Sequence, residues 1–327
     1  MDRIGYFGDK MKKILAFSIL LALPLFAEVK VAVFGGLWPM PVILSFLTDA
    51  QIVYMPKASV NAAKYSVVAE LKPEFLEIPY GSNENIEELL GLDVDVYMCH
   101  IADMKLYTQL QRANKEVISF PVNVENYNLK KALQVWLEGV GKYFDIALKQ
   151  KEILEDITQT EEFIAKRTQD SQAKVMILKS LNHNQIALGG RDYLIEKSGG
   201  ENVFKSSNDG LVNLEAIYKF DPDVIFITNF TDTQEKDLLQ SKEWQRLKAV
   251  KEKRVHKLPL ATYRPYAPSL DIAPTLLFMA KKTYPSLFED ISLEDIFKKH
   301  FLKFYGIPLT QKQVELILKP DFRAGII

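Results

Sequence analysis

One pattern of polar and apolar residues occurs twice in this 327-residue chain, 128 positions apart. The run Asn85-Ile86-Glu87 leads to Asp-Val-Asp-Val from Asp93, and Asn213-Leu214-Glu215 leads with the same spacing to Asp-Pro-Asp-Val from Asp221. Each copy is typical of a short amphipathic helix, an acidic turn and a buried strand. Duplication at this distance predicts two similar α/β lobes, and a cleft between lobes is a preferred place to bind a small molecule.

The first residues are typical of a secretory signal peptide. Basic residues at Met11-Lys12-Lys13 precede an apolar run from Ile14 to Phe26, and Ala27 offers a small residue for cleavage. The alternative is a membrane anchor, but the run is shorter than the roughly 20 residues that span a bilayer. Either Met1 or Met11 is the initiator. We therefore expect an exported, soluble protein that is cleaved near Ala27.

Composition excludes several classes of protein. The chain has 41 basic and 42 acidic residues, interspersed, which gives no sign of a nucleic-acid surface. Its only cysteine, Cys99, rules out an intramolecular disulfide and lies far from the predicted cleavage site, so it cannot carry a lipid there. We interpret Cys99 as a small buried residue. We expect a monomer without a cofactor.

Alternating strand and helix patterns predict a first α/β lobe over residues 28–126, with a parallel sheet covered on both faces. The proline-free stretch from Leu129 to Arg167 has apolar residues at three- and four-residue steps, up to Leu148, which predicts a connecting helix over 127–169. It could also be two helices, because Gly139 and Gly141 weaken its middle. A second α/β lobe is expected over 170–327. The predicted fold class is therefore α/β, with two doubly wound lobes, a long connecting helix and a ligand cleft between the lobes.

This order of elements resembles the periplasmic binding proteins of ABC importers for siderophores, haem, cobalamin and other metal chelates. The two repeats carry the resemblance, together with Gly199-Gly200-Glu201-Asn202-Val203 and the Trp-x-x-Leu-x-Ala-Val run from Trp244 that leads to Arg254-Val255. The resemblance covers nearly the whole chain after the signal peptide and is weakest around residues 37–56. The resemblance implies a periplasmic location and an inner-membrane ABC permease as partner.

The resemblance also implies a docking role for Glu87 and Glu215, because in that family a glutamate on each lobe engages arginines of the permease. Two exposed carboxylates at equivalent positions can each form a bidentate pair with an arginine. The alternative is that both are ordinary glutamates favoured by a helix N-terminus.

Ligand-binding residues are expected at the carboxyl ends of the strands, facing the cleft. Arg264 is the strongest candidate, because a guanidinium flanked by Tyr263, Pro265 and Tyr266 is suited to an oxyanion or a planar ligand. It could instead be structural. The other candidates are Trp38, Met40, Met55, Lys57, Ser59 and His100 from the first lobe and His183, Asn184, Arg191, Asn229 and Tyr263 from the second.

The four histidines indicate what kind of ligand to expect. None are in a close pair, which argues against a bare metal ion and favours a metal that is already chelated. His256 and His300 fall in a strand and in an exposed helix, and we assign neither to a site. A ferric siderophore ranks first, haem or cobalamin second with His100 or Tyr263 as a possible axial ligand, and a nickel chelate or an oxyanion third.

A secreted enzyme is the alternative of another class. The sequence lacks a nucleophile-elbow Gly-x-Ser-x-Gly, a His-Glu-x-x-His zinc helix and a phosphate-binding Gly-x-x-x-x-Gly-Lys-Ser/Thr loop. We therefore expect no catalytic residues and no enzymatic activity.

Overall fold

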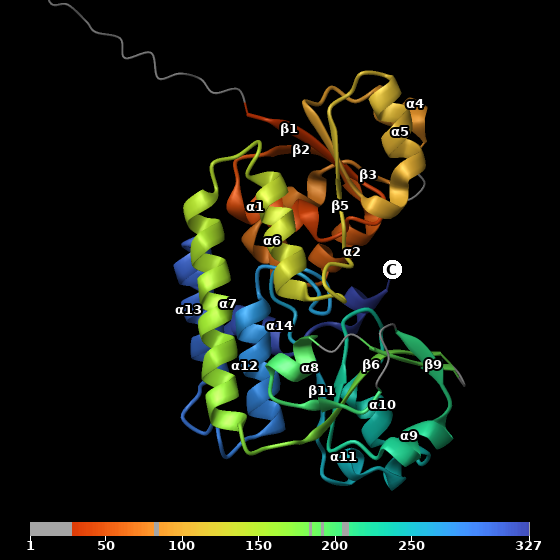
Figure 1. Ribbon diagram of the computed structural model, residues 1–327, viewed down its shortest axis with the longest axis vertical. Coiled ribbons are helices and arrows are strands. Elements are labelled where there is room, and N and C mark those ends of the chain that lie inside the picture. The colour runs from red at the N-terminus through yellow and green to blue at the C-terminus, as the bar shows by residue number, and fades with distance from the viewer. Residues whose placement is uncertain (1–27, 82–84, 183–184, 191–192, 205–208, 327) are drawn as a thin grey trace, which may run out of the picture.

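Two β-sheets, each flanked by helices, lie at opposite ends of the molecule (Figure 1). The computed structural model describes residues 28–81, 85–182, 185–190, 193–204 and 209–326. The predicted signal peptide, residues 1–27, lies outside the described residues. We call the part that contains the first sheet the N-terminal lobe and the part that contains the second the C-terminal lobe.

The first sheet is parallel throughout, as predicted from the alternation of strands and helices. Its first strand, β1, lies in the middle and is almost completely buried, as expected for a strand covered on both faces. In spatial order the strands are β3 (Tyr80–Gly81), β2 (Gln51–Pro56), β1 (Lys30–Phe34), β4 (Val96–His100) and β5 (Val117–Phe120).

The second sheet is mixed, whereas the first is parallel throughout. Strands β6, β10 and β11 are parallel and repeat the arrangement of β1, β4 and β5. At the other edge β7 is antiparallel to β6, and β9 is antiparallel to β7. Strand β7 follows β6 directly in a hairpin, so no crossover helix separates them. The strands are β11 (Val255–Lys257), β10 (Val224–Ile227), β6 (Lys174–Asn182), β7 (Gln185–Leu188) and β9 (Gly210–Val212), and β8 (Glu201–Asn202) pairs with β6.

Helices flank both sheets, and the long helix α7 runs along one side of the molecule beside α12 and α13 (Figure 1). The α-helices are α1 (Met40–Leu47), α2 (Lys57–Lys64), α3 (Val68–Leu71), α4 (Ile86–Leu90), α5 (Met104–Arg112), α6 (Leu129–Val140), α7 (Ala147–Thr168), α8 (Tyr193–Lys197), α9 (Leu214–Phe220), α10 (Glu235–Leu239), α11 (Lys248–Lys251), α12 (Ile272–Thr283), α13 (Leu293–Tyr305) and α14 (Gln311–Leu318). Short 3-10 turns are η1 (Pro73–Glu77), η2 (Ile101–Asp103), η3 (Trp244–Arg246) and η4 (Phe322–Gly325).

The duplicated motif performs the same two structural tasks in both lobes. Asn85 and Asn213 cap α4 and α9, each accepting a hydrogen bond from the backbone N–H three residues on. The second aspartate of each copy then joins neighbouring strands. Asp95 Oδ2 accepts from the backbone N–H of Lys30 at 2.8 Å, and Asp223 Oδ2 accepts from that of Lys174, also at 2.8 Å.

The connection between the lobes consists of two helices, α6 and α7. This confirms the alternative of two helices in place of a single connecting helix. Helix α6 ends at Val140 and α7 begins at Ala147, so the phase of the apolar pattern is reset, and Leu148 is 69% exposed. Helix α6 packs on β5, whereas α7 packs on α12. The predicted boundaries at residues 28–126, 127–169 and 170–327 stay a proposal.

A polar bridge ties both parts of the connection to α8. Glu161 of α7 accepts hydrogen bonds from Lys130 Nζ of α6 at 2.8 Å and from the Tyr193 hydroxyl of α8 at 2.9 Å. Burial, with the adjacent Glu161 carboxylate, raises the pKa of Tyr193 well above its usual range, so this hydroxyl remains a donor. Glu161 therefore links α6, α7 and α8 through side-chain hydrogen bonds.

We predict that Asp223→Ala lowers the free energy of unfolding by about 1–3 kcal/mol, because it leaves the Lys174 amide without its charged partner. Burial alone would raise the pKa of Asp223, but hydrogen bonds from Lys248 Nζ and Lys174 N–H outweigh it, so the pKa is lowered. This stabilisation is present above the unfolded-state pKa of about 4 and is lost as the pH falls through the lower folded-state value.

Urea unfolding at neutral and acidic pH checks the Asp223 prediction. Asp93→Ala is the matched control, since Asp93 is the first aspartate of the other copy and its side chain is 92% exposed. Its ion pair with Lys30 lies at the surface and should contribute little. Equal effects of the two substitutions would contradict the structural role of the second aspartate.

Candidate ligand cleft

A cavity of about 300 Å³ lies between the lobes, where segments that follow the strands of both sheets meet. The N-terminal lobe contributes the turn after β1 and the segment after β5, and α6 contributes one indole. The C-terminal lobe contributes the middle of β6, the segment after β10 and the loop between β11 and α12. The lining residues are Gly36, Trp38, Pro39, Val122, Trp136, Lys179, Ser180, Phe230, Tyr263, Tyr266, Ala267 and Pro268.

Aromatic side chains form much of the wall, and their positions are fixed by hydrogen bonds. The Trp136 indole N–H donates to the carbonyl of Pro121 at 2.7 Å. The carbonyl of Trp38 accepts from the buried Ser59 hydroxyl at 2.6 Å, which holds the turn that carries the Trp38 ring. These walls offer flat apolar surfaces on which a planar ligand can stack.

The polar groups of the cavity are organised by Asp209. One carboxylate oxygen accepts from Lys179 Nζ at 2.5 Å, and the other accepts from the Tyr266 hydroxyl at 2.6 Å and the Gly190 amide at 3.3 Å. Tyr266 has a left-handed backbone, with φ of 76°, an uncommon conformation for a non-glycine residue that is often found at functional sites. Lys179 is therefore a cation with its counter-charge already in place.

Arg264 lies directly behind the cavity wall and is completely buried. Its Nε and Nη2 atoms both donate to the carbonyl of Ala324, at 2.9 and 2.6 Å, and its guanidinium carbon lies 5.2 Å from the centre of the Phe230 ring. Within the described residues, neither Arg264 Nη1 nor the Tyr263 hydroxyl has a hydrogen-bond partner of good geometry, although the two side chains interact with each other. Burial raises the pKa of Tyr263 to about 12, against the opposing influence of Arg264, so the phenol stays protonated.

The loop that carries these residues is itself buried, which is unusual for a connection between elements. Asp271 holds it in place, because its carboxylate accepts hydrogen bonds from the backbone and side chain of Thr262 and from the Tyr305 hydroxyl. His300 Nε2 lies 3.2 Å from the same carboxylate. His300 is thus buried in contact with Asp271, which corrects the expectation of an exposed helix position.

Comparison with known proteins identifies the family. A profile described as "Periplasmic binding protein" matches residues 48–261. The chain belongs to this family.

Similar proteins of known name or structure agree with this assignment. The binding protein is 24% identical to the molybdate-binding protein MolA of Haemophilus influenzae over 244 residues, which are 68% of this chain and 70% of MolA. A periplasmic solute binding protein from Veillonella parvula has the same fold, with a TM-score of 0.77, 23% identity and coverage of 89% and 92% of the two chains. Helicobacter pylori CeuE, solved as a Ni-His complex, gives a TM-score of 0.69 at 21% identity, with 88% and 93% covered.

Of the residues that the sequence nominated, the binding protein places Trp38 and Tyr263 in the cavity wall and Arg264 immediately behind it. Ser59 supports the Trp38 turn. Asn229 is buried and donates to the carbonyls of Leu258 and Pro259, at 2.9 and 3.1 Å, so it shapes the buried loop. His183, Asn184 and Arg191 lie outside the described residues.

Three other nominees do not line the cavity. Met40, the first residue of α1, and Met55, within β2, are completely buried and pack into the hydrophobic core. Lys57 is exposed at the first position of α2. Neither docking candidate is buried: Glu87 and Glu215 are exposed in the first turns of α4 and α9, one on each lobe (Figure 1).

Sequence reasoning missed several residues that line the cavity, notably Lys179, Ser180, Phe230 and Tyr266. Lys179 and Ser180 come directly after the apolar run of β6. The expectation that ligand-binding residues follow the strands could therefore have identified them. Phe230 follows the nominated Asn229 by one residue. Trp136 has an ordinary core position in the helical pattern, and nothing in the sequence distinguishes it.

His100 lies at the end of β4, with its ring close to the backbone of Gly36 at the cavity edge. Its Nδ1 accepts a hydrogen bond from the amide of Ala102 at 3.1 Å, and burial lowers its pKa despite the opposing charge of Asp103. Neutral His100 must therefore carry its proton on Nε2. In that tautomer Nε2 can donate to a ligand but cannot coordinate a metal.

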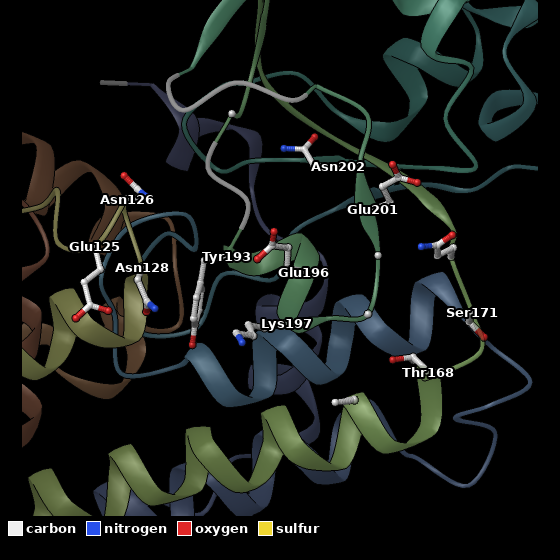
Figure 2. Close-up of a pocket in the computed structure, with 15 residues that line it drawn as sticks. Glu125, Asn126, Asn128, Thr168, Ser171, Tyr193, Glu196, Lys197, Glu201 and Asn202 are labelled. Carbon is white, nitrogen blue, oxygen red and sulfur yellow. The ribbon is translucent and has the colours of Figure 1, made fainter.

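A larger groove, of about 1000 Å³, lies beside the cleft on the side of α7 and α8 (Figure 2). Figure 2 shows Glu125, Asn126 and Asn128 of the N-terminal side facing α8, with Glu201 and Asn202 on the far side. Its lining is mainly polar, and its labelled carboxylates outnumber its one lysine, Lys197. Tyr193 is the one aromatic residue among those that line it, whereas the smaller cavity has several.

Within the ranges that the structure describes, no group of three or more His, Cys, Asp or Glu side chains could hold a metal ion. The same ranges contain no helix that is long and apolar enough to cross a membrane. The buried Cys99 is a free thiol whose pKa is raised to about 12, mainly by burial, so it is unreactive, as expected from the sequence.

We predict that His100 remains neutral at pH 7 and is protonated on Nε2. The nitrogen chemical shifts of the imidazole, measured by two-dimensional NMR on labelled protein, distinguish the two neutral tautomers. A proton on Nδ1 would contradict the hydrogen bond from Ala102 and would make His100 available as a metal ligand. His256, whose pKa burial lowers to about 4, provides a second neutral histidine for reference.

Proposed function

We propose that this protein is the substrate-binding component of an ABC importer and that it captures a compact metal chelate with an anionic edge. A small ferric siderophore stays the first candidate. The observation that supports this proposal is the pairing of an aromatic cavity with a buried, incompletely hydrogen-bonded cation immediately behind its wall. In this function the ligand is released to the permease unchanged.

The size of the cavity supports a compact ligand. Its volume of about 300 Å³ lies at the lower end of the range for small-molecule sites, about 300–1,000 Å³. Haem and cobalamin are larger cofactors that need a broader pocket. The volume therefore favours a small chelate over these alternatives.

The chemistry of the wall supports a ligand with both a flat face and an anionic edge. Trp38 offers a stacking surface, while Arg264 Nη1 and the Tyr263 hydroxyl have no hydrogen-bond partner of good geometry within the described residues. A buried donor without an acceptor costs free energy, which an anionic ligand would recover. Access to Arg264 requires the half-buried Phe230 ring to turn, and such side-chain movements are common on binding.

A bare oxyanion is less well supported by these contacts. An oxyanion needs several N–H and O–H donors around it, and the aromatic surfaces would contribute little to its binding. Lys179 also has Asp209 as its partner already. The molybdate-binding relative nevertheless makes molybdate a necessary probe.

We predict that Arg264→Gln weakens binding of the ligand about 10- to 100-fold, as expected for the loss of a hydrogen bond to a charged group. Isothermal titration calorimetry with ferric 2,3-dihydroxybenzoate, nickel(II)–histidine, sodium molybdate and haemin measures this and ranks the ligand classes. Lys57→Ala is the matched control, because Lys57 is an exposed cation outside the cavity. This variant should bind the ligand with unchanged affinity. Haemin as the tightest ligand would argue against the compact chelate, and an unaltered affinity in Arg264→Gln would exclude the anionic contact.

The periplasmic location and the docking to the permease complete the proposal. The signal peptide ending near Ala27 would direct export, and the mature protein would act as a monomer. Glu87 and Glu215 occupy equivalent positions of the two repeats, and both are exposed with their side chains on the first turn of a capped helix. Equivalent carboxylates on two lobes suit a permease with two equivalent arginine clusters.

We predict that a Glu87→Ala, Glu215→Ala double variant binds its ligand normally in solution but no longer supports transport. Uptake of the radiolabelled metal complex into cells that carry only this variant measures the second effect. A Glu88→Ala, Glu243→Ala variant, which removes two nearby exposed carboxylates, is the control and should transport normally. Normal uptake with the first variant would remove the docking role.

A further inference from the structure

The segment that follows α14 meets both lobes at the place where they approach each other. Its 3-10 turn η4 packs against α2 of the N-terminal lobe, and the Arg323 guanidinium lies 4.6 Å from the centre of the Tyr65 ring at the end of that helix. Figure 1 shows this end of the chain between the two lobes, beside α2. Ala324 and Gly325 are buried there.

The same segment makes the hydrogen bonds that orient Arg264. The carbonyl of Ala324 accepts from Nε and Nη2, at 2.9 and 2.6 Å, which fixes the plane of the guanidinium. Nη1 remains, and it is the nitrogen without an acceptor in the described part of the chain. A guanidinium held by one edge presents its other nitrogen in a fixed direction.

The position of Ala324 is fixed in turn by close contact with the C-terminal lobe. A Cβ atom at Gly325 would lie 2.0 Å from the carbonyl oxygen of Thr231, so only glycine fits between these backbones. The loop at Thr231 is itself held by the buried Lys257, whose Nζ donates to the carbonyls of Thr231 and Thr233, both at 2.7 Å. Ala324 thus has little freedom to move relative to Arg264.

We infer that residues 321–326 are a positioning element for the ligand: the carbonyl of Ala324 aims Arg264 at the cleft, and the contact with α2 places this element under the influence of both lobes. The expected effect on ligand affinity rests on the proposed function. In this arrangement η4 does not contact the ligand itself. Its role is to hold the Nε and Nη2 edge of the guanidinium, which fixes the direction of Nη1.

A double-mutant cycle tests the inference, using calorimetry with ferric 2,3-dihydroxybenzoate, nickel(II)–histidine and sodium molybdate. One variant ends at Pro320, and a second, Gly325→Val, displaces the segment without removing it. Each is measured with Arg264 intact and with Arg264→Gln. We expect either change to weaken binding about tenfold when Arg264 is present and less than twofold when it is absent, because η4 acts through Arg264.

Phe322→Ala is the matched control, since Phe322 belongs to η4 but is 51% exposed, and it should bind normally. Equal losses of affinity in both Arg264 backgrounds would show a general structural role and overturn the inference, as would unchanged affinity. Far-UV circular dichroism establishes that each variant is folded.

Hydrogen exchange without ligand separates this inference from the proposed function. The amides of residues 262–264 and 266 should exchange faster in the shortened protein and in Gly325→Val than in the wild type or in Phe322→Ala. Unchanged exchange would overturn the positioning role, whatever the ligand. Failure of all three probes to bind the wild type would count against the proposed function alone, and the exchange result would then decide on η4.

Discussion

The fold depends on a backbone hydrogen bond to an aspartate that occurs once in each lobe. Asp95 and Asp223 each accept from the first amide of the neighbouring strand, at Lys30 and Lys174, while their own amides donate to the carbonyls of the same two residues. This pair of bonds sets the register of adjacent parallel strands at their amino ends. Because register determines where each strand ends, it also determines where the loops that form the cleft begin.

Much of the architecture could be predicted from the sequence because the two repeats carry local signals. Asn85 and Asn213 mark helix starts, and the aspartates precede buried strands, so the paired α/β lobes follow from short-range chemistry. The antiparallel β7 and β9 could not be predicted in this way, since their pairing depends on a hairpin and an edge rather than on a distinctive periodicity. The connecting helix was ambiguous because its apolar pattern continues to Leu148, across the turn that divides it.

The candidate site was only partly predictable for a related reason. Trp38, Tyr263 and Arg264 follow predicted strands or belong to an unusual run of aromatic residues and proline, and they do lie at the cleft. Asp209, which holds Lys179 and Tyr266, is distant from both in sequence and has no motif of its own. Met40 and Met55 were also expected to follow strands and face the cleft, yet their side chains pack in the hydrophobic core. Whether a residue at a strand end faces a cavity or the core is decided by tertiary packing.

The distribution of the three tryptophans gives the molecule a built-in optical probe. Trp38 and Trp136 both line the cavity, whereas Trp244 is buried in a separate cluster of the C-terminal lobe. A coloured metal complex in the cleft would lie beside the wall to which Trp38 and Trp136 contribute, whereas Trp244 does not line this cavity. Occupancy of the cleft can then be followed by emission quenching without any label, with the emission of Trp244 as a constant background.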